Sequence, residues 1–119
     1  IWKFNDIYYA NGYNHNTLPQ ILEKVDVGIV PSLWEDNLPQ VAIEYHARKI
    51  PIITSDKGGA PELANNINYT YSSFDKEELY KILRNIISGK FTHNDYWQNC
   101  RPPISMVEHC NTLINKYYK

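Results

Sequence analysis

Two acidic residues flank the predicted start of a helix and are the strongest candidates for chemistry in this sequence. Asp36 lies in a loop, Glu44 follows after seven intervening residues, and Pro39 between them suits the first turn of a helix. The start of a helix presents unpaired backbone N–H groups and a positive dipole end, and both favour phosphate. A carboxylate beside such a site can accept hydrogen bonds from sugar hydroxyls, as in nucleotide sites of α/β folds. The spacing alone also fits an ordinary helix cap or solvated surface charges.

Two loops hold the residues that could surround such a site. Ser32, Trp34 and Glu35 belong to the first loop, and Gly58 and Gly59 belong to the second. The two glycines would let backbone approach a ligand, or they would only permit a tight turn. Trp34 would line a cleft, or it would pack on the core as aromatic side chains commonly do. We name all five residues as candidates to line a cleft.

The elements that must position these loops are short and alternate in type. Strand patterns occur at residues 6–10, 25–30, 50–54 and 67–71. Helical patterns occur at residues 18–24, 40–49, from 61 onward, 75–89 and 105–118, whereas residues 92–103 are expected to be irregular. This alternation predicts an α/β fold with a mostly parallel sheet. Ligands of such sheets bind beyond the carboxyl ends of the strands, where both loops lie.

Several residues are expected to begin helices. Thr17 with Gln20, and Asp75 with Glu78, have the spacing of capping boxes, and Ser105 would cap the last helix. The last helix would carry its apolar residues on one side, namely Val107, Cys110, Leu113, Ile114 and Tyr117.

Length and composition exclude several classes of protein. The chain has 119 residues, which suits a single domain, and 43% hydrophobic with 21% charged residues is ordinary for a globular protein. Twelve Lys+Arg against thirteen Asp+Glu give a net charge of −1, which argues against binding nucleic acid through bulk charge. Cys100 and Cys110 are too few for a disulfide scaffold and are expected to be reduced thiols of a cytoplasmic protein. His46 would point away from Glu44, to the surface or the core, and no metal-ligand spacing is present.

Three linked motifs carry a family resemblance. They are Pro31-Ser32 with Asp36 and Glu44, then residues 50–56, then Gly58-Gly59-Ala60-Pro61-Glu62. Residues 18–63 thereby resemble the C-terminal, nucleotide-sugar-binding domain of the group 1 (family 4) glycosyltransferases, retaining enzymes with the two-domain GT-B fold. The resemblance implies a Rossmann-like three-layer sandwich, of which residues 1–119 would be a partial, N-terminally truncated domain. Asp36 stands where that family has Glu, and Lys49 stands where it often has Gly.

The resemblance also implies roles for single residues. Glu44 would hydrogen-bond the ribose of the donor nucleotide, and Asp36 would contact hydroxyls of the transferred sugar. Sugar and diphosphate would meet the backbone N–H groups of Asn37, Leu38, Gln40 and Val41. Gly12 and Tyr13 lie where the nucleobase commonly packs. A UDP- or GDP-sugar would be the donor, and neither a metal ion nor another cofactor is expected.

The implied function is hexosyl transfer to a polysaccharide or glycolipid acceptor with retention. The N-terminal acceptor-binding domain, and the basic residues that neutralise the leaving diphosphate, would lie outside this chain, which alone is expected to be inactive. The resemblance implies a cytoplasmic enzyme, and the aromatic C-terminus suggests contact with the inner face of a membrane. Two alternatives stay open: a sugar-nucleotide epimerase on the same scaffold, and a non-catalytic α/β interaction module.

Overall fold

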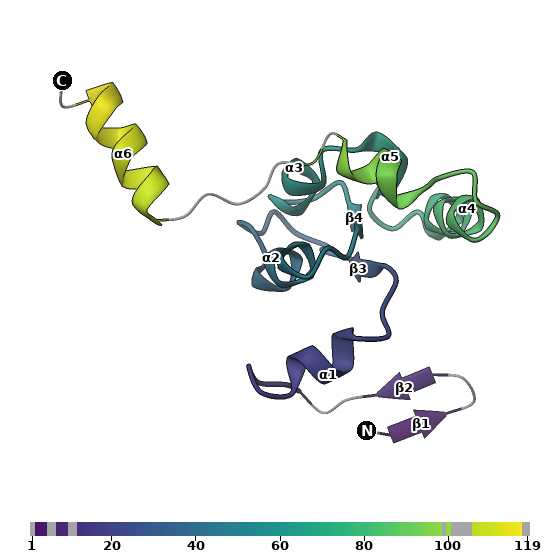
Figure 1. Cartoon of the computed structure of the whole chain (residues 1–119). Helices are drawn as coiled ribbons and strands as arrows, with labels where there is room; N and C mark the ends of the chain where they lie inside the picture. Colours follow the sequence, from purple (N-terminus) through teal and green to yellow (C-terminus); the bar gives the residue numbers. More distant parts are fainter. Residues whose placement is uncertain (1, 5–6, 10–11, 99, 101–105, 118–119) are drawn as a thin grey trace.

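A parallel sheet of three strands organises the chain (Figure 1). The structure, a computed structural model, describes residues 2–4, 7–9, 12–98, 100 and 106–117. The sheet has the order β3 (Gly28–Val30), β4 (Ile52–Ser55), β5 (Thr70–Tyr71), in which Ile29 pairs with Ile53 and Thr54 pairs with Thr70. The predicted α/β fold with a parallel sheet is confirmed.

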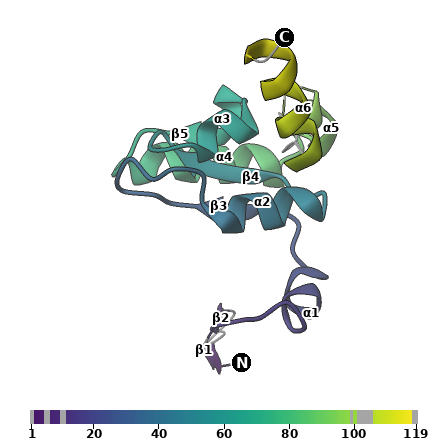
Figure 2. The same cartoon turned by 90° about the vertical axis from the view of Figure 1, so that its left-hand side faces the viewer.

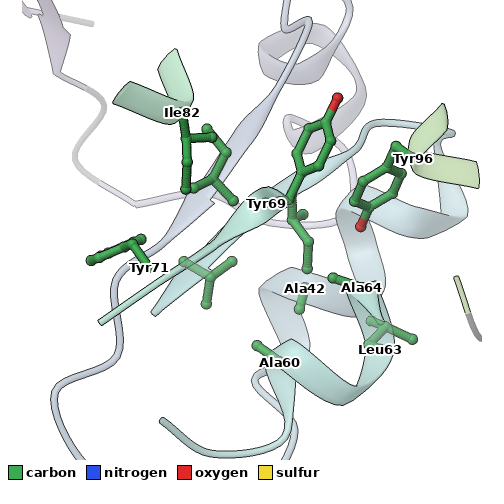
Figure 3. Close-up of a cluster of buried hydrophobic side chains, with 11 residues drawn as sticks. Ala42, Ala60, Leu63, Ala64, Tyr69, Tyr71, Ile82 and Tyr96 are labelled. Atoms are coloured by element: carbon green, nitrogen blue, oxygen red, sulfur yellow. The ribbon is translucent and has the colours of Figure 1, made fainter. Parts of the chain in front are cut away.

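Helices cover both faces of the central strand β4. Successive side chains of a strand point to opposite faces, and all four residues of β4 are buried. The helix α2 (Gln40–Ala47) contacts β3 and β4, α3 (Ala60–Ala64) contacts β4, and α4 (Lys76–Ile87) contacts β5 (Figure 2). The buried core between them holds Val30, Ala42, Ile52, Ile53, Ala60, Leu63, Ala64, Tyr69, Tyr71, Ile82 and Tyr96 (Figure 3).

The edge strand β3 is covered on one face only. A Cβ placed on Gly28 would lie 2.5 Å from the ring of Tyr45, so α2 packs directly on that face. Ile29 points to the other face and is 39% exposed. Glycine at position 28 therefore allows α2, the helix of the predicted site, to lie close to the sheet.

The first predicted strand does not join this sheet. It is present as β2 (Ile7–Tyr9), which pairs antiparallel with β1 (Trp2–Phe4), and Asp6 and Ala10 of the prediction lie outside the described residues. The expectation that it extends the parallel sheet is wrong. Only two residues separate β1 from β2 in the sequence, which favours an antiparallel partner close by over a distant parallel one.

The start of α1 (Leu18–Leu22) also differs from the prediction. The side chain of Thr17 does not cap this helix, so the predicted capping box with Gln20 is wrong. Thr17 instead accepts the N–H of Asn14 at 2.9 Å, and Asn14 Oδ1 accepts the N–H of Thr17 at 3.0 Å. Asn and Thr side chains compete for nearby backbone groups in this way, and here the resulting turn replaces the cap.

Two further segments differ from the structure that their sequence predicts. Residues 67–71 form a 3₁₀ turn, η1 (Ile67–Tyr69), before the short β5, because the side chain of Asn66 accepts the N–H of Asn68 and closes the turn. Residues 92–98 are not irregular but contain α5 (His93–Trp97), which starts with a capping box between Thr92 and Asp95. Asp in place of Glu at the third helical position concealed this signal.

The last two long helices agree with their patterns. Asp75 caps α4 as predicted by accepting the N–H groups of Glu77 and Glu78, both at 3.1 Å. The other half of the predicted capping box is wrong, because the Glu78 carboxylate accepts the N–H of Ser72 and not that of Asp75. The final helix is α6 (Met106–Tyr117), and its predicted cap Ser105 lies outside the described residues. The predicted apolar side of α6 is exposed along its length. No helix in the described ranges is both long and apolar enough to cross a membrane.

A buried polar pair fastens α5 to α2. His46 Nε2 is hydrogen-bonded to the hydroxyl of Tyr96, and both side chains are buried. The rings of Tyr96 and Trp97 meet the His46 ring edge to face, with centroids at 5.6 and 5.1 Å. Burial, and then the charge of Lys49, lower the pKa of His46, and burial raises the pKa of Tyr96. The core interpretation of His46 is therefore correct, and the neutral imidazole is the form that fits.

This pair predicts that stability falls as the solution becomes mildly acidic. The pKa of His46 is lower in the folded chain than in the unfolded chain, so the unfolded chain binds more protons below the ordinary value. We expect a lower melting temperature at about pH 5.5 than at about pH 7.5, and His46→Gln should remove most of that difference. Thermal unfolding followed by circular dichroism measures both. His15→Gln, at an exposed position, is the control, and an equal pH dependence in wild type and His46→Gln would contradict the prediction.

Candidate functional site

The loops after β3 and β4 touch each other through their backbones. The N–H of Gly59 donates to the carbonyl oxygens of Asn37 at 2.7 Å and Asp36 at 3.1 Å. The N–H of Gly58 donates to Glu35 Oε2 at 3.0 Å. We call this set of hydrogen bonds the loop tie. It brings together five predicted cleft and site residues, since parallel strands end at the same edge of a sheet.

The two glycines are required for this close approach. A Cβ on Gly58 would overlap the carbonyl oxygen of Asp36, and a Cβ on Gly59 would lie 2.6 Å from the carbonyl oxygen of Asn37. Gly58 also has a φ of +74°, which favours glycine. The space beside both glycines is thus filled by the first loop, so they serve contact between the loops.

Side chains reinforce the loop tie on either side. Ser55 Oγ donates to the carbonyl oxygen of Ser32 at 2.6 Å, and Lys57 Nζ lies 3.8 Å from Glu35 Oε1. Asp56 accepts the N–H and the hydroxyl of Ser73, the residue that follows β5 closely. These two hydrogen bonds lower the pKa of Asp56, so its carboxylate stays charged. The loops after all three strands are therefore connected.

Ser73 was missed by the sequence analysis. Its position in the sequence could have indicated it, because a residue that follows the third parallel strand lies at the same edge of the sheet as the loops after the other two strands. That inference required the end of β5, which the sequence pattern placed correctly at residue 71.

The carboxylate of Asp36 lies against its own loop. Its Oδ1 accepts the N–H of Asn37 at 2.8 Å, and both residues are exposed. A ligand that takes the N–H of Asn37 would have to replace this hydrogen bond. Both the carbonyl and the side chain of Asp36 therefore accept hydrogen bonds that hold this loop.

The helix α2 begins beside this loop without a side-chain cap. Pro39 is the N-cap residue, and the helix starts at Gln40 as predicted. The N–H of Ala42 donates back to the Pro39 carbonyl at 3.0 Å. The N–H groups of Gln40 and Val41 belong to the first turn, where the helix itself offers no acceptor. Such an end attracts an anion through these donors and the helix dipole.

Glu44 lies in the second turn of α2 and is paired with Tyr13. The Tyr13 hydroxyl donates to Glu44 Oε2 at 2.8 Å, although the two residues are 31 positions apart in the sequence. This hydrogen bond is the main reason that the pKa of Tyr13 is raised. The structure thus brings two predicted nucleotide-binding residues together. Gly12, with a φ of +92°, precedes Tyr13 and has open space around it. No hydrogen bond between described residues links this pair to Asp36.

The aromatic residue of the first loop faces solvent. Trp34 is 68% exposed and its neighbour Leu33 is 51% exposed, so the interpretation that Trp34 packs on the core is wrong. The Trp34 carbonyl accepts the N–H of Asp36 at 2.8 Å, so the backbone turns at this point of the loop. Among the described residues, no three side chains of His, Cys, Asp and Glu gather as metal ligands.

The loop tie predicts a difference between two glycine substitutions. Gly58→Ala should destabilise the chain by about 1–3 kcal/mol more than Gly89→Ala, because a new methyl group is forced into packed atoms only at position 58. Gly89 has a similar φ of +82° and open space around it, so it controls for the backbone strain. Urea unfolding gives both free energies. Equal losses in the two variants would show that the loops do not need this contact.

Comparison with known proteins identifies the family of this chain. The model of a family described as "Glycosyl transferases group 1" matches residues 5–101. Comparisons with curated proteins and with solved structures give no match. The matched residues include both tied loops, the start of α2 and the Tyr13–Glu44 pair, and they make up most of the sequence. The chain belongs to the group 1 glycosyltransferases.

Proposed function

We propose that this chain is the donor-binding domain of a retaining group 1 glycosyltransferase of family 4, as the C-terminal part of a GT-B fold. One observation carries the proposal: the uncapped start of α2 and the carboxylate of Glu44 lie on one helix, at the carboxyl edge of a parallel sheet. A donor such as UDP- or GDP-sugar offers an anion and a ribose diol, which are the groups that these two features can bind.

Each residue has a part in this scheme. The N–H groups of Gln40 and Val41 face the diphosphate, and Glu44 accepts a hydrogen bond from the ribose. Asp36 accepts from a hydroxyl of the transferred sugar, beside the N–H groups of Asn37 and Leu38, and the base lies near Gly12 and Tyr13. These groups bind and orient the donor without a metal ion.

The reaction breaks the bond between the anomeric carbon and the diphosphate oxygen, and a bond from that carbon to an acceptor oxygen replaces it. The N–H groups at the start of α2 stabilise the charge that grows on the departing diphosphate. In this proposal a second domain binds the acceptor, and basic residues on further strands of the donor-binding domain supply more positive charge, so residues 1–119 alone do not catalyse transfer. The acceptor is a polysaccharide or a glycolipid. Cytoplasmic location and contact with the inner face of a membrane stay predictions.

Loss of the Glu44 charge should weaken nucleotide binding. A hydrogen bond to a charged acceptor contributes about 1.5–3 kcal/mol, so Glu44→Gln should raise the dissociation constant about ten- to hundredfold. Amide NMR titration with UDP and with GDP measures this, and the perturbed amides should lie in the first loop and at the start of α2. The nucleotide with the lower dissociation constant also identifies the base of the donor.

Glu77→Gln provides the matched control, because Glu77 is an exposed glutamate in the first turn of α4. It removes the same charge far along the chain from the site and should leave binding unchanged. A well-dispersed spectrum that responds to neither nucleotide would contradict the donor-binding proposal. Equal losses in the two variants would show that only net charge matters.

A further inference from the structure

The side chain of Tyr13 joins the segment before α1 to the helix α2. Its hydroxyl donates to Glu44 Oε2 at 2.8 Å. The Tyr13 residue is 51% exposed, and Glu44 is only partly buried. The contact therefore lies at the surface, where a ligand can reach both side chains. A hydrogen bond in such a place adds little to folding stability, so its effect on the carboxylate is the feature of interest.

The backbone that follows Tyr13 is held in one turn. Asn14 Oδ1 accepts the N–H groups of Asn16 and Thr17, at 2.9 and 3.0 Å. The carbonyl of Asn14 accepts the N–H of Leu18 at 2.9 Å, and Thr17 Oγ1 accepts the N–H of Asn14. The side chain of Tyr13 therefore extends from a backbone segment that is ordered by these hydrogen bonds.

The same turn is anchored to the helix that carries Glu44. Leu18 and Leu22 of α1 are buried against Ile50, and Tyr45 of α2 packs against this cluster. Tyr45 is the immediate neighbour of Glu44. The donor and the acceptor of the surface hydrogen bond therefore lie on segments that one apolar cluster joins.

Only one oxygen of the Glu44 carboxylate is used by this contact. Oε2 accepts from Tyr13, and Oε1 accepts from no group among the described residues. A carboxylate is planar and has about four acceptor positions, so fixing Oε2 also fixes the direction in which Oε1 accepts. A free glutamate loses rotamer freedom when a ligand immobilises it, and prior ordering removes that loss.

We propose that Tyr13 is a positioning residue: its hydroxyl holds the Glu44 carboxylate so that Oε1 is presented to a ribose hydroxyl of the nucleotide, an inference that rests on the donor-binding function proposed above. Tyr13 acts through Glu44 and needs no hydrogen bond of its own to the ligand. The hydroxyl of Tyr13, rather than its ring, is the group that matters for this role.

A double-mutant cycle tests the inference. The dissociation constants of UDP and GDP are measured by calorimetry for the wild-type chain, Tyr13→Phe, Glu44→Ala and the double variant. We expect Tyr13→Phe to weaken binding about three- to tenfold, the range of one ordinary hydrogen bond. In the Glu44→Ala background the same change should have no further effect, because its target is absent.

A second ligand, the 2′,3′-dideoxynucleoside diphosphate, separates this role from a merely structural one. It is the same nucleotide without its ribose hydroxyls. Tyr13→Phe should leave its binding unchanged, since Oε1 then has no hydroxyl to accept. Tyr80→Phe is the matched control, because Tyr80 is 55% exposed on α4 and loses the same hydroxyl group far from Glu44 in the sequence. It should bind UDP and GDP like the wild type.

The outcomes separate the two proposals. If Glu44→Ala weakens binding and Tyr13→Phe leaves it unchanged or makes it tighter, Tyr13 does not position the carboxylate, and donor binding stands. If Tyr13→Phe weakens the dideoxy analogue equally, its hydroxyl acts on another part of the ligand, and the inference is wrong. If the wild type binds neither UDP nor GDP, the donor-binding proposal fails, and this inference fails with it.

Discussion

The N–H of Gly59, shared between the carbonyls of Asp36 and Asn37, is the contact on which the geometry of the site depends. The first loop is exposed along most of its length, so burial cannot hold it in place. The side chains of this loop have defined positions only where hydrogen bonds hold its backbone. The loop tie supplies these bonds from the loop after β4, whose own position follows from a fully buried strand. The buried strand thus holds the second loop in place, and backbone hydrogen bonds from that loop hold the exposed first loop.

The helix α2 is supported independently, from two directions. Residues two apart on a helix differ in direction by about 200°. His46 therefore reaches the core and bonds to Tyr96, while Glu44 reaches the surface and bonds to Tyr13. The core contact does not compete with the site for the same side of the helix. Glycine at position 28 completes this arrangement, because it lets the intervening Tyr45 lie directly on the sheet.

The sequence predicted the elements whose apolar pattern is continuous and whose partners lie close by. The strands β3 and β4 and the helices α2, α4 and α6 agree with their predicted segments to within a few residues. The errors arise where short polar side chains decide the backbone. The side chain of Asn14 takes the place of the expected cap of α1. That of Asn66 closes a 3₁₀ turn over three of the five residues of an expected strand, and Thr92 with Asp95 starts an unexpected helix. Hydropathy does not report such local hydrogen bonds.

The same distinction between local patterns and contacts over long sequence distances applies to the predicted site. The resemblance named both loops, because its motifs are fixed in spacing, and the range matched by the family model includes both loops. It did not predict that the glycines face the first loop or that Tyr13 pairs with Glu44. Both are contacts between segments far apart in the sequence, and they depend on how closely the backbones approach.

The position of Asp36 shows how such contacts constrain chemistry. Its carbonyl belongs to the loop tie, and its Oδ1 already accepts the N–H of Asn37, a contact within reach of a short side chain. The Glu of the family pattern would carry the carboxylate about 1.5 Å farther from the backbone. In the proposed donor complex, a sugar hydroxyl that binds to the remaining oxygen of Asp36 would therefore have to approach the first loop more closely. The backbone that Gly59 holds limits that approach. Under the proposed function, the shorter acid and the loop tie would therefore together set how deeply a donor sugar can bind.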